Sequence, residues 1–311
     1  MLVFEGLITA LAGGVGAARF LSGLIKIVNQ DEITIIANTG DDIELFGLHI
    51  SPDIDIVTYT LAGIVDEEKG WGVRGDTFNC LEMFKTLGLK PWFMLGDQDL
   101  ATHIYRTNRI KQGVSLTQIT AEICSALDLK VRILPMTNDK FETKIKTKEG
   151  FMHFEEYFVK KQCKDEVLDV KFEGATSAKP SPEVLESILD AETVIVCPSN
   201  PIVSIGTILS INGVREALRR TKAKVIAVSP IVAHATIKGP ADKMMRGLGI
   251  EVSAYGVARL YADFLDIIVI DQKDALEKSR IEEIGVKVKV TNTVMKSLDD
   301  KIALAKIVLE H

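Results

Sequence analysis

The feature that most constrains the fold is a glycine-rich turn near the N-terminus. An apolar run at residues 7–11 is followed by Gly13, Gly14 and Gly16, and amphipathic spacing then continues to residue 28. This order predicts a buried strand, a tight turn and a helix whose N-terminus faces the turn. The free backbone N–H groups and the helix dipole at such a turn favour a phosphate group. A glycine-rich connection without a ligand is the alternative.

The turn departs from both common phosphate-binding motifs. A dinucleotide fingerprint that starts at Gly14 and Gly16 needs a third glycine where Arg19 stands. A Walker A loop that starts at Gly13 needs Gly-Lys-Ser/Thr from Ala18 onward, and this sequence lacks it. The turn therefore predicts phosphate binding without assigning the nucleotide.

Short β-branched runs alternate with helical patterns along most of the chain. Near-continuous apolar runs are typical of parallel strands that are buried on both faces. We expect strands at residues 8–12, 33–37, 131–134, 194–197, 225–228, 267–270 and 286–290. Helices are expected at residues 15–28, 115–127 (opened by a capping box at Ser115), 214–220 and 297–308. The alternation predicts an α/β fold with a doubly wound, mostly parallel, Rossmann-like sheet.

Two regions interrupt this alternation. Residues 58–100 are mainly helix and loop, with Asp76 as the expected N-cap, and residues 141–172 are charged and mixed, with a hairpin turn at 148–150. Neither ends in a linker rich in Pro, Gly or Ser, so we interpret both as insertions in a single α/β domain over residues 1–308. Residues 309–311 resemble the start of a histidine tag.

Composition argues against several classes of partner. The net charge of −6 disfavours a nucleic-acid partner. No apolar run reaches the roughly 20 residues that span a bilayer, and the N-terminus, with Glu5 and no basic region, does not predict a signal peptide. The four cysteines are scattered, which predicts reduced thiols in a cytoplasmic protein without a zinc site.

Small or polar residues follow four of the expected strands. Because the carboxyl ends of parallel strands meet at one edge of a sheet, these residues predict one pocket for a nucleotide. A Lys-Gly-Pro turn at residues 238–240 is a weaker phosphate signal. The candidate nucleotide- and phosphate-binding residues are Gly13, Gly14, Gly16, Asn38, Ser199, Asn200, Ser204, Ser229 and Gly239.

Asp53 and Asp55 form a candidate magnesium site. They are two residues apart, so both side chains would point to one face of an extended chain. Paired carboxylates repel each other unless a cation bridges them, and Mg²⁺ prefers oxygen ligands and commonly binds substrate phosphates. The alternative is a solvated turn in which the carboxylates accept backbone hydrogen bonds.

Two further segments could recognise a polar or planar ligand. His103 and Arg106 share a helical face in a segment with Asp97 and Asp99, where an exposed helix start capped by Asp99 is the alternative. Trp71 lies close to Arg74 in the sequence, and an aromatic beside an arginine can stack on a heterocycle, although packing is the alternative.

Taken together, these segments resemble the 2-phospho-L-lactate transferase family, whose members make the deazaflavin hydride carrier of methanogens and actinobacteria. The resemblance extends from residue 10 to about residue 265. The segments that carry it are residues 13–16, 38–42, 51–55, 71–72, 95–106, 198–206, 229–231 and 239–241.

The resemblance implies an enzyme that is a 2-phospho-L-lactate transferase. A 2-phospholactyl or enolpyruvyl-phosphate group would pass from a guanosine-diphosphate-linked donor to the ribityl hydroxyl of 7,8-didemethyl-8-hydroxy-5-deazariboflavin, and GMP would leave. It also implies magnesium dependence and a homodimer. The alternatives are a dinucleotide-dependent enzyme and a regulatory protein that binds a nucleotide without turnover.

The resemblance also implies roles for individual residues. Asp53 and Asp55 would be the catalytic and metal-binding carboxylates, with Asp55 touching both metal and deazaflavin. Many relatives carry a basic residue where this chain has Met94, so we expect packing against the ring without charge there. The implied deazaflavin contacts are Asp55, Met94, Trp71, His103 and Arg106.

Overall fold

A seven-stranded sheet forms the centre of the computed structural model, which describes residues 6–311. Its order is β14-β13-β10-β9-β1-β2-β5, and all neighbouring strands are parallel. The strands are β1 (Ile8–Ala12), β2 (Ile33–Ala37), β5 (Arg132–Pro135), β9 (Thr193–Val196), β10 (Lys224–Val228), β13 (Ile267–Asp271) and β14 (Lys287–Thr291). Each lies within one residue of its expected bounds, so the predicted doubly wound fold is confirmed. Glu5, used in the signal-peptide argument, lies outside the described residues.

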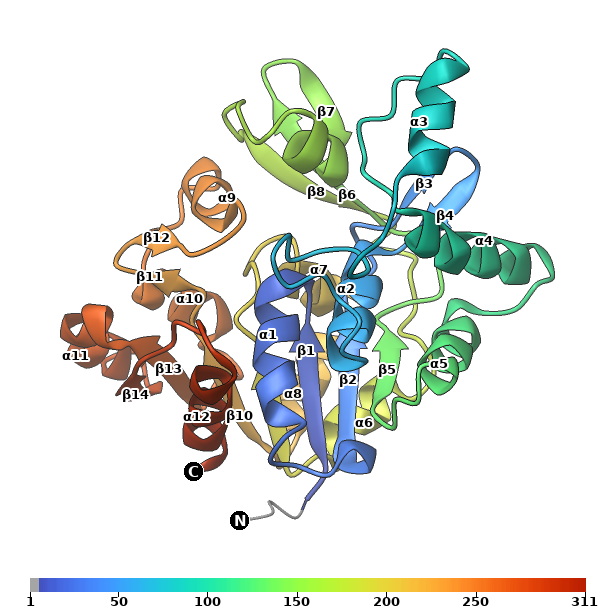
Figure 1. The fold of residues 1–311 in the computed structure, drawn as a ribbon. Helices are drawn as coiled ribbons and strands as arrows, with labels where there is room; N and C mark the ends of the chain where they lie inside the picture. The colour runs from blue at the N-terminus through green and yellow to red at the C-terminus, as the bar shows by residue number, and fades with distance from the viewer. Residues whose placement is uncertain (1–5) are drawn as a thin grey trace.

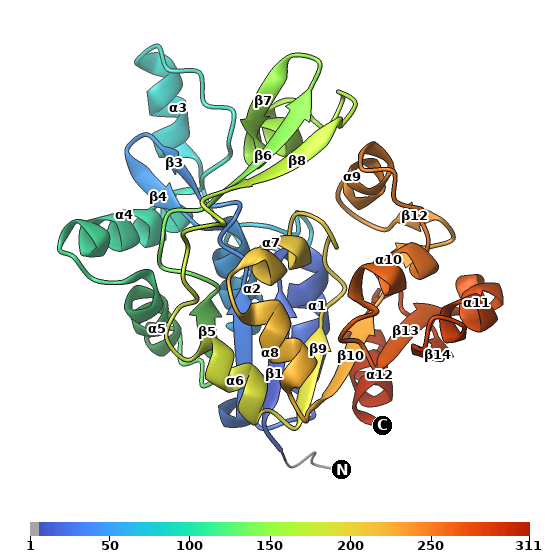
Figure 2. The ribbon, with the colours of Figure 1, turned by 180° about the vertical axis from the view of Figure 1, so that it is seen from behind.

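Helices cover both faces of this sheet (Figures 1 and 2). One face packs against α1 (Gly14–Leu24), α2 (Pro52–Leu61) and α12 (Leu298–Leu309), and the other against α6 (Val184–Asp190), α8 (Val214–Arg220) and α10 (Ala254–Tyr261). Along β1, Ile8, Ala10 and Ala12 belong to the apolar core on the side of α1, α2 and α12. Leu11 belongs to the core on the other side, because successive side chains of a strand point to opposite faces. The remaining helices are α3 (Asn79–Thr86), α4 (Asp97–Lys111), α5 (Leu116–Ala126), α7 (Ile205–Ser210), α9 (Ala241–Gly247) and α11 (Lys278–Glu282). Among the described helices, none is long and apolar enough to cross a bilayer.

Two insertions extend beyond the carboxyl ends of the strands (Figure 1). The first holds α3 and the start of α4. A hairpin of β3 (Ile43–Leu45) and β4 (Leu48–Ile50) lies earlier in the chain, before α2. The second is an antiparallel sheet of β6 (Glu142–Thr147), β7 (Gly150–His153) and β8 (Asp169–Glu173), with the expected turn between β6 and β7. A small hairpin of β11 (Ile231–Val232) and β12 (Ala235–Thr236) precedes α9.

One capping prediction is wrong. Asp76 was expected to cap the helix that follows it, but α3 begins later, after Phe78. The Asp76 carboxylate instead accepts the backbone N–H groups of Gln98 and Asp99 in the first turn of α4. In return, Asp97 of α4 accepts the N–H groups of Asn79 and Cys80 in α3. Each helix is thus capped by a carboxylate from the other segment.

The chain reverses its winding direction between β1 and β9. From β1 it proceeds to β2 and β5 on one side, and later to β9, β10, β13 and β14 on the other. The turns after β1 and β9 therefore meet at a topological switch point, where ligands of such sheets bind. A Cβ on Gly16 would lie 2.1 Å from the carbonyl oxygen of Pro198, so this approach requires glycine.

Candidate functional site

A cavity of about 950 Å³ lies over the switch point. Its walls come from the turns after β1, β9 and β10, from both insertions and from the loop that leads into α9. All the candidate nucleotide-binding residues except Asn38 line this cavity. They therefore lie together, as their positions after the carboxyl ends of parallel strands predict. Asn38 is fully buried and supports the wall, since its amide donates to Asp53 at 2.9 Å and to Asp41 at 3.1 Å.

The glycine turn is packed against the turn after β9. The N–H of Gly13 donates to the Oγ of Ser199 at 3.3 Å. A Cβ on Gly13 would lie 2.6 Å from the Cβ of Ser204 and 2.7 Å from Oδ2 of Asp53, so the three segments converge only because residue 13 has no side chain. Asn200 contributes a buried Nδ2 that has no hydrogen-bond partner among the described residues.

The expectation that Asp53 and Asp55 lie in an extended segment is wrong. Pro52 occupies the first turn of α2, a position that its fixed φ favours, and both aspartates belong to that helix. Residues two apart on a helix point in directions about 200° apart. Asp53 therefore contacts the glycine turn, whereas Asp55 contacts α4, and both still line the cavity.

Asp53 belongs to a buried group of carboxylates. Burial raises the pKa of Asp53 to about 6 and that of Glu155 to about 8, and the nearby acids add to both effects. Burial, with the charges of Asp53 and Glu155, also raises the pKa of Asp41. Oδ1 of Asp41 and Oδ1 of Asp42 are buried and have no hydrogen-bond partner among the described residues. The group thus gathers acidic side chains, and no lysine or arginine is paired to Asp41 or Asp53 in the described part of the chain.

The candidate metal-binding residues chosen from the sequence leave out three members of this group, Asp41, Asp42 and Glu155, and the sequence suggests Asp41 or Asp42 only as a ribose contact of a dinucleotide-dependent enzyme. Asp41 lies in the polar segment after β2, whose position at a strand end was a usable signal. Glu155 reaches the cavity from the second insertion, just after β7, and nothing in the local sequence marks it.

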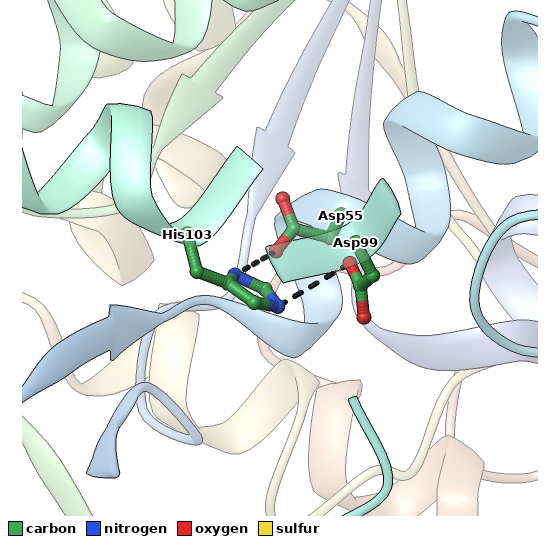
Figure 3. Close-up of side chains that lie close together, drawn as sticks. All are labelled: Asp55, Asp99 and His103. Atoms are coloured by element: carbon green, nitrogen blue, oxygen red, sulfur yellow. Dashed lines mark ion pairs between the residues drawn. The ribbon is translucent and has the colours of Figure 1, made fainter. Parts of the chain in front are cut away.

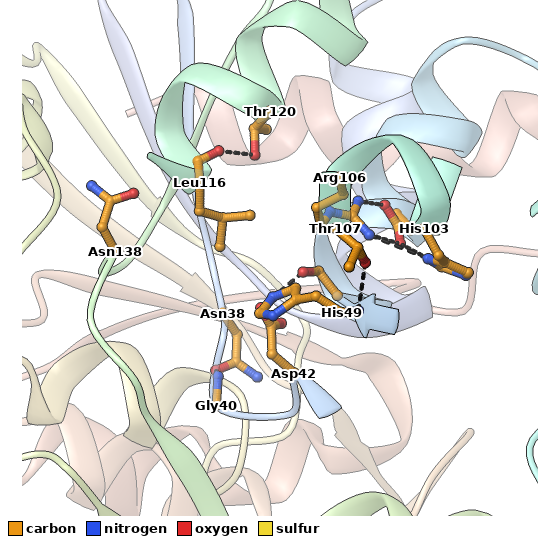
Figure 4. A network of polar contacts seen from close by, with 12 residues as sticks. Asn38, Gly40, Asp42, His49, His103, Arg106, Thr107, Leu116, Thr120 and Asn138 are labelled. Carbon is orange, nitrogen blue, oxygen red and sulfur yellow. Dashed lines mark hydrogen bonds and ion pairs between the residues drawn. The ribbon is translucent and has the colours of Figure 1, made fainter. Parts of the chain in front are cut away.

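Asp55 belongs to a separate, charge-balanced network. Both of its oxygens accept hydrogen bonds from Arg106, one at 3.0 Å, and His103 lies beside them (Figures 3 and 4). Arg106 is fully buried and does not line the cavity, so it holds Asp55 from behind, whereas His103 reaches the cavity wall. The prediction that His103 and Arg106 share a helical face is confirmed.

Asp42 connects the two groups to the β3–β4 hairpin. One Asp42 oxygen accepts from the Oγ of Ser51 at 2.8 Å and lies 2.9 Å from Nε2 of His49. The backbone N–H of His49 donates to Thr107 of α4 (Figure 4). The first turn of α2 and the middle of α4 are thereby fixed relative to each other.

The aromatic and apolar candidates lie at another wall. Trp71 and Met94 line the cavity and are 38% and 41% exposed, so each has free surface for a ligand. Trp71 also packs edge-on against Phe78, with ring centroids 6.4 Å apart. Phe93, Phe154 and Phe158, which sequence reasoning did not select, line the same cavity.

Four cationic side chains, Arg19, Lys69, Lys238 and Lys296, line the cavity, and Arg19 and Lys238 lie close to each other. Arg19 comes from α1 and Lys238 from the loop before α9. Burial lowers the pKa of Lys238, and the charge of Arg19 lowers it further. Two adjacent cations can together neutralise an anionic group. Arg19 is the residue that breaks the dinucleotide fingerprint.

Comparison with known proteins identifies the family. The family model described as 2-phospho-L-lactate transferase CofD matches residues 8–308. The chain is 42% identical to a 2-phospho-L-lactate transferase of Methanosarcina mazei over 96% of this chain and 98% of that protein. It is also 42% identical to a phosphoenolpyruvate transferase of Streptomyces griseus, over 97% of each chain.

A solved structure supports the fold alone. Protein BH3568 of Bacillus halodurans superposes with a TM-score of 0.66 at 16% identity, covering 99% of this chain and 100% of that one. The family assignment rests instead on the match across nearly the whole sequence. The chain is therefore a member of the 2-phospho-L-lactate transferase family.

Proposed function

We propose that this enzyme transfers a 2-phospholactyl or enolpyruvyl-phosphate group from a guanosine-diphosphate-linked donor to the ribityl hydroxyl of the deazaflavin precursor, releasing GMP. The observation that carries the proposal is the division of one cavity into three parts. The glycine turn, with Arg19 and Lys238 nearby, suits a diphosphate. The carboxylate group, which has no lysine or arginine paired to Asp41 or Asp53 in the described residues, suits a divalent cation. The aromatic wall suits a planar ring. Relatives of equal identity are named for either donor, so both remain in the proposal.

The donor would bind at the switch point. The Oγ of Ser199 accepts the N–H of Gly13 and keeps its own O–H to donate to a phosphate, and Val15 and Gly16 at the start of α1 also line the cavity. Arg19 and Lys238 would neutralise the negative charge of the diphosphate. The unpartnered Nδ2 of Asn200 is an additional donor.

A magnesium ion would bind at the carboxylate group. Asp41, Asp53 and Glu155 line the cavity, and the buried Oδ1 atoms of Asp41 and Asp42 have no hydrogen-bond partner among the described residues, so these carboxylates offer the hard oxygen ligands that Mg²⁺ prefers. Among residues 6–311, Asp55, Asp99 and His103 are the only such group with three ligand atoms within 4.8 Å, so an ion here would draw the carboxylates closer together. A bound Mg²⁺ would neutralise phosphate charge that develops during transfer. From the expected pair we assign Asp53 to the metal, whereas Asp55, already bonded to Arg106, would contact the acceptor from the cavity wall.

The protein's own contribution is position and charge. The ribityl oxygen forms a bond to the phosphorus that bears the lactyl or enolpyruvyl group, and its hydroxyl proton is released to solvent. The bond from that phosphorus to the bridging oxygen breaks, and the leaving GMP takes the electron pair. Such a transfer depends mainly on alignment and electrostatic stabilisation. The aromatic wall would hold the ring while the turns after β1 and β9 hold the diphosphate.

The direct test measures product. Purified protein with Mg²⁺, the guanylyl donor and the deazaflavin alcohol is expected to release GMP as the coupled product forms. Asp53→Asn should abolish most turnover, whereas Asp31→Asn, an exposed acid outside the cavity, should not. Nucleotide binding without GMP release would contradict the transferase and favour a regulatory protein.

A further inference from the structure

Asp99 is a buried acid in the wall of the cavity. It lies in the first turn of α4, is 8% exposed and lines the cavity. Its Oδ1 accepts from the hydroxyl of Tyr59 at 2.9 Å and lies 3.3 Å from Nε2 of His103 (Figure 3). Among the described residues, none donates a hydrogen bond to Oδ2. The carboxylate is thus held by one oxygen while the other is unused.

Arg106 determines the tautomer of His103. A guanidinium group only donates hydrogen bonds, and Nη1 of Arg106 lies 3.3 Å from Nδ1 of His103. A hydrogen bond between these two atoms requires Nδ1 to be the accepting nitrogen, which places the ring hydrogen on Nε2. This is the nitrogen beside Asp99, so the ring presents positive rather than negative polarity to the carboxylate (Figure 3).

The same arrangement argues against a cation among these three residues. Asp55, Asp99 and His103 offer ligand atoms within 4.8 Å of one another. Arg106, however, already supplies the positive charge for Asp55 and occupies the lone pair of His103 Nδ1. A metal ion here would face a buried guanidinium. The network is therefore one that orients Asp99.

The surroundings of Asp99 indicate what its free oxygen could accept. Phe93 and Met94 precede α4 in the chain, and with Trp71 they line the same cavity. A planar ring against these side chains would present its edge, or the chain attached to it, to a carboxylate. A carboxylate accepts hydrogen bonds and cannot donate them when ionised. The complementary group on a ligand is an N–H or an O–H.

We propose that Asp99 determines specificity for the acceptor, with its Oδ2 accepting a hydrogen bond from a ring N–H or a side-chain O–H of the deazaflavin alcohol. Tyr59, whose hydroxyl donates to Oδ1, is a positioning residue, and His103 lies beside the carboxylate with Nε2 3.3 Å from Oδ1. The proposal rests on the function proposed above, because that function supplies the acceptor. Asp99 would thus recognise the acceptor, and buried Arg106 would orient His103 beside it.

Asp99→Asn tests the proposal. The amide oxygen of the new asparagine can still accept the hydrogen bond from Tyr59. In that orientation its NH₂ group faces the cavity, where it would meet the N–H or O–H donor of the acceptor. Loss of a hydrogen bond to a charged group predicts a rise in KM for the deazaflavin alcohol of about tenfold to a hundredfold. We expect kcat at saturating acceptor and KM for the guanylyl donor to stay within about threefold, because neither depends on this contact.

Asp97→Asn is the matched control. It makes the same change of charge in the same helical turn, but Asp97 does not line the cavity, and asparagine can still cap α3. Tyr59→Phe is a second, milder variant, which removes one hydrogen bond to Asp99 without changing a charge. It should raise the acceptor KM several-fold in the same direction. An unchanged acceptor KM in both Asp99→Asn and Tyr59→Phe would overturn the proposal.

Acceptor analogues distinguish the two sources of the hydrogen bond. An N-methylated ring removes the N–H, and a deoxyribityl analogue removes a hydroxyl other than the one that reacts. The wild type should bind one of them more weakly than the parent alcohol, and Asp99→Asn should lose that discrimination. Equal discrimination in wild type and variant for every analogue would contradict the assignment. Calorimetric titration of each acceptor without donor gives the same comparison even if no GMP is released, so failure of the transferase proposal remains distinguishable.

Discussion

At the scale of single residues, substitutions of two neighbouring aspartates should lower stability by very different amounts. Asp55→Asn leaves the buried guanidinium of Arg106 without its counter-charge, which is expected to lower the free energy of unfolding by about 3–5 kcal/mol. Asp53→Asn should cost far less at pH 8 without Mg²⁺, since burial raises the pKa of Asp53 to about 6 and a neutral amide avoids the buried charge. Urea unfolding of both variants measures the difference. Equal losses would contradict the separation of the two networks.

Glu155 makes a prediction about pH. Its pKa rises from 4.5 to about 8 in the folded protein because the group is buried, so between these values the folded state binds a proton that the unfolded state has lost. This contribution to stability is present below pH 4.5 and falls as the pH rises toward 8. Glu155→Gln should therefore unfold at a higher temperature than the wild type at pH 8 without Mg²⁺, and the difference should vanish near pH 4.5. Thermal unfolding across this range checks the sign, and a difference that grows as the pH falls would contradict it.

At the scale of elements, the local sequence predicts the positions of helices more reliably than it predicts their capping residues. Ser115 caps α5 through the N–H of Gln118, as its position predicts, because both partners lie in one turn. Asp76 bonds instead to α4, more than 20 residues later, and no spacing rule indicates such a partner. Pro52, a residue favoured in the first turn of a helix, indicates that α2 begins there. Asp53 and Asp55 share one face only in an extended chain, so the pairing expected of them does not hold in this helix.

The cap at α4 can be tested by removing it. Asp76→Ala deletes the acceptor for the N–H groups of Gln98 and Asp99, a loss of about 1 kcal/mol. Because this turn positions Asp99, the KM for the acceptor should rise while the KM for the donor does not. Hydrogen exchange at the Gln98 and Asp99 amides should accelerate.

Ser115→Ala provides the comparison for the cap. It removes the cap of α5, which is outside the cavity, and should lower stability by a similar amount without changing either KM. If both variants alter acceptor KM equally, the effect is one of general stability.

At the scale of the whole molecule, the central sheet was predictable because its strands are buried on both faces and appear as apolar runs. The three strands of the second insertion could not be predicted, since burial alternates along β6 while Ile145 is the single apolar residue among its six. The order of the strands, which brings the turns after β1 and β9 together, depends on pairing between distant segments. Glu155 illustrates the consequence: it joins the carboxylate group only through tertiary folding.

The last prediction follows from a cavity whose lining extends from Gly13 to Lys296. A ligand that contacts these segments together binds only the folded chain, and at a hundred times its Kd it should add about 2.7 kcal/mol to the free energy of unfolding. GDP with Mg²⁺ should therefore raise the Tm more than GDP alone, because the cation would lie between the diphosphate and the carboxylates. In Asp53→Asn the increment from Mg²⁺ should disappear while that from GDP persists, because the glycine turn and Arg19 are intact. Calorimetric scans with each ligand, and after removal of Mg²⁺ by EDTA, measure both increments. A Mg²⁺ increment that is unchanged in this variant would place the cation elsewhere.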